Sequence, residues 1–184
     1  QAEDGIRDRL VTGVQTCALP IFEPTKATRY IQYFVTENLS NWYVRLSRRR
    51  FWKGDYQHDK ISAYQTLYTC MLTVAKLSSP IAPFYMDTLY KDLVAVTGKG
   101  FESVHLESFP VYDELLIDAD LERKMQKAQK ISSMVLSLRK KEMIKVRQPL
   151  QRVMIPVLDN QDRDDILAIQ NLIISEVNVK EIEL

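Results

Sequence analysis

Cysteine is scarce in this sequence, and so are long apolar runs. Cys17 and Cys70 are the only two cysteines among 184 residues, which excludes a structural zinc site built on cysteine ligands. Two isolated cysteines fit a reducing compartment, so we expect a cytoplasmic protein. No apolar run approaches the roughly 20 residues that a membrane-spanning helix needs, so we expect no membrane partner.

Histidine is equally rare, and nothing else in the sequence supplies a catalytic combination. Neither His58 nor His105 has a plausible catalytic partner. The sequence shows no nucleophile–base pair, no metal-binding cluster and no glycine-rich loop that could cradle a phosphate. We therefore expect no catalytic residue, no metal and no cofactor in this chain.

The first 21 residues show neither helical nor strand periodicity and have no relation to the rest of the chain. A disordered arm is one interpretation. A signal peptide is another, although acidic residues spoil the basic leader that it requires. The stretch also resembles the conceptual translation of an indexed sequencing-library adapter, with Arg9 and Leu10 at the index. We therefore predict that residues 1–22 are a non-native, disordered segment and that the protein proper begins at about Phe22 or Glu23.

The rest of the chain has the composition of a globular protein, with 46% hydrophobic and 27% charged residues. Apolar residues at spacings of three and four predict helices over residues 24–50, 60–77, 83–98 and 118–141. Residues 100–118 read as an extended connection.

The pattern changes after residue 150. A short apolar run predicts a strand over 153–158, helical spacing returns over 162–174, and alternation predicts a half-buried strand over 177–182. The predicted fold class is mainly α. It comprises a helical bundle at 23–118, then a long helix and a small α/β unit at 119–184 that is truncated at its C-terminus.

The formal net charge of +1 hides a segregated pattern. Residues 26–60 hold eight Lys or Arg against three Asp or Glu, and residues 120–152 hold ten against three. Residues 87–118 and 153–184 each hold two against seven. Two basic segments therefore stand out, although no global field indicates a nucleic-acid partner.

The first basic segment gathers its cations at a helix end. They are Arg45, Arg48, Arg49, Arg50 and Lys53, interleaved with Phe51 and Trp52. Arginine presents a planar fork that matches phosphate oxygens, and exposed aromatic rings can stack on unpaired bases. This mixture suits a single-stranded RNA loop and its flanking backbone. The alternative is a solvated helix face, with Trp42 and Trp52 packed in the core or at its rim.

The second basic segment surrounds a loop that contains Lys145 and Arg147. Its other cations are Arg139, Lys140, Lys141 and Arg152. A helix C-terminus favours cations through its macrodipole, and this alternative to RNA binding stays open on charge alone.

Several blocks of sequence resemble the class I aminoacyl-tRNA synthetases that are specific for isoleucine. They are LSNWYVR (39–45), RRRFW (48–52), AYQTLY (63–68), SVHL leading to Phe109 and Pro110, and KVRQPL (145–150). The resemblance covers about residues 24–184 in unbroken order and falls on the anticodon-binding domain. The class I nucleotide signatures are absent, so the resemblance implies that ATP and Mg belong to a catalytic domain of a longer parent enzyme.

The resemblance implies that this chain binds the anticodon arm of an isoleucine-accepting tRNA and packs against other domains of its parent. Our own hypothesis from the charge pattern places the RNA contacts at Arg45, Arg48, Arg49, Arg50, Trp52, Lys53, Lys145 and Arg147. The structural signature is Asn41, Trp42, Tyr43, Gln148 and Pro149. We expect the arginine-rich helix end and the basic loop to form one concave face for the stem-loop. Two alternatives remain: a docking module that uses residues 41–43, and the same domain of a valine-type synthetase.

Overall fold

The computed structural model describes residues 24–53, 55–111 and 117–184. The chain divides into two compact units, Gln1–Ile117 and Asp118–Leu184. The described part is mainly helical, with one two-stranded sheet in the second unit, so the predicted fold class is confirmed. The segment predicted to be non-native, residues 1–22, lies outside the described residues. No helix in the described part is long and apolar enough to cross a membrane.

One helical run opens the described part of the first unit. It consists of α2 (Pro24–Tyr33), the π-helix η1 (Phe34–Val44) and α3 (Arg48–Trp52). Proline suits the first turn of α2, where a helix needs no N–H donor. The buried positions step by five residues from Phe34 to Leu39, a spacing that the wider π-helical turn accommodates. The predicted long helix is confirmed, but its centre is π-helical.

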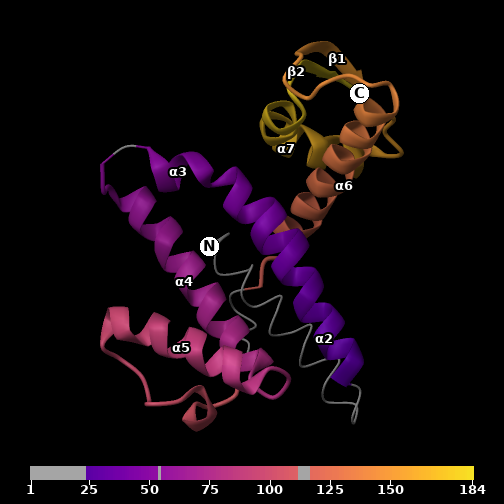
Figure 1. The fold of residues 1–184 in the computed structure, drawn as a ribbon. Coiled ribbons are helices and arrows are strands. Elements are labelled where there is room, and N and C mark those ends of the chain that lie inside the picture. The colour runs from indigo at the N-terminus through magenta and orange to yellow at the C-terminus, as the bar shows by residue number, and fades with distance from the viewer. Residues whose placement is uncertain (1–23, 54, 112–116) are drawn as a thin grey trace. The chain divides into compact units, whose positions relative to one another are not determined.

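Two further long helices pack in the described part of the first unit. In Figure 1, α4 (His58–Ser78) runs back alongside α2, and α5 (Pro83–Thr97) follows it. Gly98 ends α5 in the left-handed conformation, at φ 65°, which glycine adopts without strain. The main core is apolar and joins α2, η1 and α4 through Ala27, Ile31, Phe34, Leu39, Tyr43, Cys70, Val74 and Leu77.

Tyr90 of α5 is fully buried and fixes the segment that comes after the helix. Its hydroxyl accepts a hydrogen bond from Phe101 N at 3.0 Å and donates one to the Glu107 carboxylate. Glu107 also pairs with Lys76 of α4 at 2.8 Å. The predicted extended connection therefore folds back on α5 and contains a 3-10 helix, η2 (Val104–Leu106).

Asp87 holds the same segment from the first turns of α5. Its carboxylate accepts hydrogen bonds from Ser103 Oγ at 2.7 Å and Val104 N at 3.0 Å. Lys91 and these two donors lower the pKa of Asp87 to about 2. The SVHL block of the sequence thus has a structural role here, while the His105 side chain is exposed.

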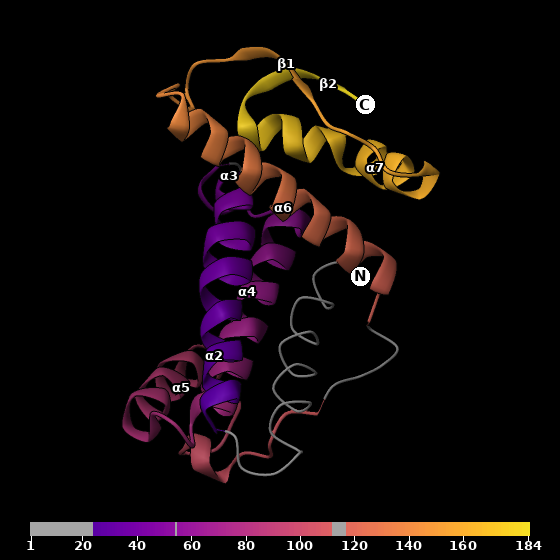
Figure 2. The ribbon, with the colours of Figure 1, turned by 90° about the vertical axis from the view of Figure 1, so that its right-hand side faces the viewer.

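The second unit is a βαβ arrangement packed on a long helix. Its elements are α6 (Ala119–Lys141), β1 (Leu150–Met154), α7 (Asn160–Val177) and β2 (Val179–Glu183). The strands pair in parallel, with Leu150 opposite Val179, and α7 forms the crossover that parallel strands require. Figure 2 shows α7 lying along α6.

The predicted boundaries of the first strand were wrong. We expected a strand over 153–158, but the ladder runs from Leu150 to Met154 and ends with the bond from Ile155 N to Glu183 O. Pro156 explains the early end, because proline has no N–H to donate to a ladder. The helix predicted over 162–174 and the second strand are confirmed, with the helix extending to Val177.

Candidate nucleic-acid interface

The arginine-rich helix α3 is anchored to the start of α4 by aromatic side chains. The Phe51 ring lies 6.4 Å from the Tyr43 ring, edge-on, and 5.1 Å from the Tyr64 ring. Both tyrosine hydroxyls donate to backbone carbonyls across the corner, Tyr43 to Ala63 O at 3.1 Å and Tyr64 to Phe51 O at 3.3 Å. These bonds set the direction in which α3 presents its other side chains.

Arg50, one of the predicted RNA contacts, is used inside the protein. Its guanidinium forms a bidentate pair with Asp59 at 2.8 and 2.9 Å and also donates to the Asp59 carbonyl at 3.1 Å. A fork-to-carboxylate pair fixes both side chains in one geometry. Arg50 therefore ties α3 to the first turn of α4, and any contact of its own with RNA stays a prediction.

The remaining side chains of α3 and its C-cap point to solvent. Arg48, Arg49 and Lys53 are exposed, and no acceptor among the described residues pairs with any of the three side chains. Trp52 is 80% exposed. The alternative that placed Trp52 in the core or at its rim is wrong, because Phe51 takes the inward position at this corner.

Tyr56 was missed by the sequence reasoning. It lies in the turn between α3 and α4, 77% exposed, with Lys60 Nζ 4.6 Å from the centre of its ring. A cation over one ring face leaves the other face open for stacking. An aromatic residue in a turn directly after a basic cluster is a signal that could have identified it.

The signature Asn41-Trp42-Tyr43 divides between core and surface. Trp42 and Tyr43 are buried in η1, whereas Asn41 and Arg45 are exposed. Burial confirms the expectation that Trp42 belongs to the core. It contradicts the alternative in which all three residues face another domain, because two of the side chains are already covered within the chain.

In the second unit, the predicted loop presents its cations to solvent. Lys145, Arg147, Gln148 and Pro149 are all exposed. A turn closes the loop through the hydrogen bond from Gln148 N to Lys145 O at 3.0 Å. Two exposed cationic side chains on one short turn could contact adjacent phosphates.

Arg139 belongs to the same basic segment but is only 2% exposed. Its guanidinium donates to the carbonyls of Lys145, Gln148 and Asn178 at 3.1, 3.0 and 2.9 Å. A buried guanidinium in this position holds the loop from beneath. Arg139 therefore has no N–H group free at the surface to contact a phosphate.

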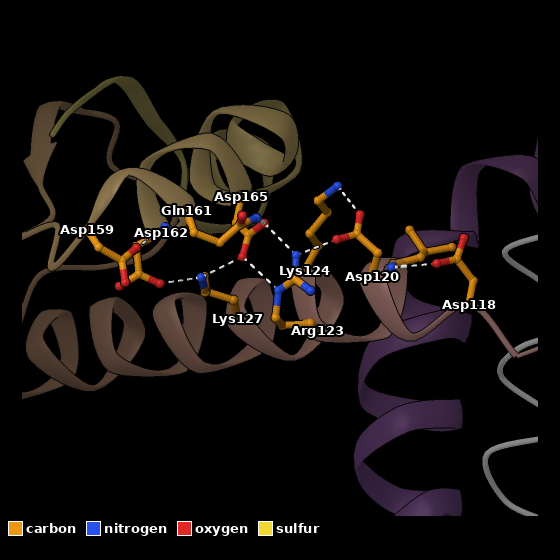
Figure 3. Close-up of polar contacts among 10 residues, drawn as sticks. Asp118, Asp120, Arg123, Lys124, Lys127, Asp159, Gln161, Asp162 and Asp165 are labelled. Atoms are coloured by element: carbon orange, nitrogen blue, oxygen red, sulfur yellow. Dashed lines mark hydrogen bonds and ion pairs between the residues drawn. The ribbon is translucent and has the colours of Figure 1, made fainter.

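Other cations of this segment are used between α6 and α7. Asp165 of α7 is fully buried and accepts from Arg123 twice at 3.0 Å and from Lys127 at 2.7 Å, as Figure 3 shows. Lys127 also pairs with Asp162 at 2.5 Å. Arg123 and then Lys127 hold the pKa of Asp165 well below its usual value. Part of the predicted basic segment therefore joins α6 to α7 through ion pairs.

The two basic sites lie in different units. The α3 corner, with the exposed side chains of Arg48, Arg49, Trp52 and Lys53, is in the first, and the Lys145–Pro149 loop is in the second. The single concave face that we expected from both stays a prediction. Among the described residues, no group of three or more His, Cys, Asp or Glu could hold a metal ion.

Comparison with known proteins places this sequence in a family. Residues 16–155 match the family described as "Anticodon-binding domain of tRNA ligase". The chain belongs to this family of anticodon-binding domains. The match begins inside the stretch that resembles an adapter, so the proposed start of the native protein remains a prediction.

The similar proteins of known name are isoleucine–tRNA ligases. The chain is 59% identical over 97% of its length to the isoleucine–tRNA ligase of Bacteroides fragilis, and 62% identical over 88% to that of Porphyromonas gingivalis. It is 36% identical over 92% of its length to the isoleucine–tRNA ligase of Thermus thermophilus. The chain spans only 14 to 16% of the length of these three relatives.

Proposed function

We propose that this chain is the part of an isoleucine–tRNA ligase that binds the anticodon arm of an isoleucine-accepting tRNA. The observation that carries the proposal is the α3 corner. There, three cations that pair with no acceptor among the described residues accompany the 80% exposed ring of Trp52. An exposed aromatic ring offers a stacking face, and the exposed cations beside it offer phosphate contacts. Proteins bind single-stranded RNA loops with this combination of aromatic and arginine side chains.

Each kind of side chain has its own task in this proposal. Arg48, Arg49 and Lys53 contact phosphates and position the arm, and these contacts carry no sequence information. Trp52 and Tyr56 stack on bases that the anticodon loop leaves unpaired, which every base permits through its π-face. The exposed loop cations of the KVRQPL block, Lys145 and Arg147, add phosphate contacts from the second unit. Hydrogen bonds to the edges of the anticodon bases would distinguish one base from another.

The parent enzyme, in this proposal, attaches isoleucine to its tRNA, using ATP, in a catalytic domain outside this chain. ATP and Mg would be bound there, and mischarged valine would be hydrolysed in a further domain. The proposed location is the cytoplasm, in agreement with the buried thiol of Cys70. The names of the relatives favour the isoleucine enzyme over a valine-type synthetase.

A docking function is the second candidate, and a different surface favours it. Phe84 and Tyr85, at the start of α5, are 89% and 69% exposed. Large exposed apolar side chains of this kind commonly mark protein–protein contacts. Docking against other domains of the parent would coexist with RNA binding, because these residues lie on α5 and the cationic residues lie on α3.

The test is a titration of the 184-residue chain with the anticodon stem-loop of an isoleucine-accepting tRNA and with an unrelated stem-loop, each at two salt concentrations. We expect preferential binding that weakens steeply with salt. Arg49→Ala should weaken it, whereas Arg29→Ala, which removes an exposed arginine from α2, should leave it nearly unchanged. Equal or absent binding by the folded chain would refute the proposal and leave docking as the function.

A further inference from the structure

The loop that carries Lys145 and Arg147 is tied down from inside the second unit. Three of its carbonyls, those of Lys145, Val146 and Gln148, accept hydrogen bonds from side chains outside the loop. The loop's side chains remain exposed while its backbone is held. A surface loop held in this way keeps one shape before any ligand arrives.

Two residues supply these bonds. Arg139 at the last turn of α6 donates from one nitrogen, Nη1, to the carbonyls of Lys145 and Gln148 at 3.1 and 3.0 Å. Asn178, the C-cap of α7, donates its amide to Val146 O at 3.0 Å. Its own carbonyl accepts from Arg139 Nη2 at 2.9 Å, so the two residues form one connected brace.

The brace accounts for the burial of an arginine that the charge pattern alone would place at the surface. Arg139 is 2% exposed, and its Nε has no hydrogen-bond partner among the described residues. Burying a guanidinium is unfavourable unless its hydrogen bonds are largely satisfied. The three carbonyls provide that compensation, and all three belong to the loop or to the residue that also holds it.

We propose that Arg139 is a positioning residue for tRNA binding, which fixes the Lys145–Pro149 loop in the shape that presents Lys145 and Arg147 to phosphate oxygens. This inference rests on the proposed function. Arg139 itself does not touch the RNA, because its guanidinium is covered. Holding the loop beforehand removes the ordering cost that a flexible loop meets on binding.

The experiment measures the salt dependence of stem-loop binding for four forms of the full chain: wild type, Arg139→Gln, the double variant Lys145→Ala/Arg147→Ala, and the triple variant. The double variant should lower the slope of log affinity against log salt by up to about 2, since each removed cation accounts for about one phosphate. Arg139→Gln should lower it by part of that amount. The triple variant should match the double variant, because Arg139 acts only through the loop.

Amide hydrogen exchange supplies a second, independent readout. Arg139→Gln should speed exchange at the backbone amides of residues 145–148 and of Leu150, while α6 and α7 stay protected. Asn178→Gly is the milder variant. Glycine keeps the left-handed backbone, at φ 52°, and the substitution removes only the hydrogen bond from the side-chain amide to Val146 O. Asn178→Gly should loosen the loop and weaken binding less than Arg139→Gln does. If Arg139→Gln fails to fold, the Asn178→Gly variant alone tests whether a loosened loop binds the stem-loop more weakly. Arg163→Gln, at an exposed position of α7, controls for the removed charge.

Several outcomes would overturn the inference. In one, the effect of Arg139→Gln adds fully to that of the double variant, so Arg139 acts elsewhere. In another, the loop loosens and binding is unchanged. If Arg49→Ala weakens binding and the double variant does not, the proposed function stands and this inference falls. If wild type shows no preference for the stem-loop, the proposed function fails, whatever the exchange data show about the brace.

Discussion

Replacing Tyr90 by phenylalanine tests the hydrogen bonding of the first unit most directly. The Tyr90 side chain is fully buried, and its hydroxyl links Phe101 N to the Glu107 carboxylate. Phenylalanine keeps the ring and the packing, so only the two hydrogen bonds are removed. Tyr85, on the same helix but 69% exposed, supplies the matched control.

The expected destabilisation depends on the groups that remain after the hydroxyl is removed. Glu107 keeps its pair with Lys76 at 2.8 Å, so the carboxylate is not left alone. The N–H of Phe101 loses its acceptor. A hydrogen bond to a charged group contributes about 1.5–3 kcal/mol and a neutral one about 1, so partial compensation by Lys76 gives an expected destabilisation of about 2–3 kcal/mol. Tyr85→Phe should change stability by less than about 0.5 kcal/mol.

The pH dependence gives the prediction a second signature. Burial, and then the hydrogen bond to Glu107, raise the pKa of Tyr90 above its usual 10.0. A raised folded-state pKa means that the contribution is fully present below pH 10 and is lost as the pH rises through the folded pKa. Lys76 and Tyr90 lower the pKa of Glu107, so its contribution is lost as the pH falls below about 4.5. The gap between wild type and Tyr90→Phe should be largest between these limits.

The assay is urea unfolding followed by tryptophan fluorescence, since both tryptophans lie in the first unit and Trp42 is buried there. Measurements at pH 4, 7 and about 10.5 cover the window that linkage predicts. Equal stability of the Tyr90→Phe and Tyr85→Phe variants at pH 7 would refute the reasoning. A gap that grows above pH 10 would also contradict it.

Three other predictions concern packing, charge and stacking. Gly100→Ala should destabilise the first unit by about 1–3 kcal/mol in the same assay, because φ is +146° and the new Cβ would lie 2.7 Å from the Tyr90 hydroxyl. Asp165→Asn should destabilise the second unit more than Asp162→Asn, by circular dichroism, and the difference should fade below pH 3.8, because the pKa of Asp165 is lowered in the folded state. Trp52→Ala should weaken stem-loop binding by about 1–3 kcal/mol, measured by titration, and leave stability nearly unchanged.

Helices were predictable where local rules and packing agree. The helix that became α6 was expected near residues 118–141 and is observed from Ala119 to Lys141, because Asp118 caps it and its buried face repeats at helical spacing. The π-helical centre of the first run was not predicted. Spacings of three and four fit either helix type over one or two turns, and only the step from Phe34 to Leu39 separates them.

Side-chain roles were less predictable than helices, because they depend on partners distant in sequence. Arg50 meets Asp59 across the α3–α4 corner, and Arg139 meets Asn178 at 39 residues' separation. Neither pairing leaves a local pattern. Phe51 and Trp52 are adjacent aromatic residues, and their order in the chain does not indicate which one turns inward. The burial of Trp42 was predictable, because this residue lies within a long apolar repeat.

The charge pattern shows why a count of cations overstates an RNA surface. Residues 120–152 carry a formal charge of +7, yet Arg123, Lys124 and Lys127 pair with aspartates and Arg139 is buried. Paired cations release few counterions when RNA binds, because their neighbours already compensate them. The salt dependence of binding should therefore follow the exposed cations of the α3 corner and the loop, rather than the formal charge of either segment. The number of cations in a basic stretch is therefore an upper limit on the number that can contact RNA. The ion pairs and buried positions inside the fold determine how many of those cations remain available to the ligand.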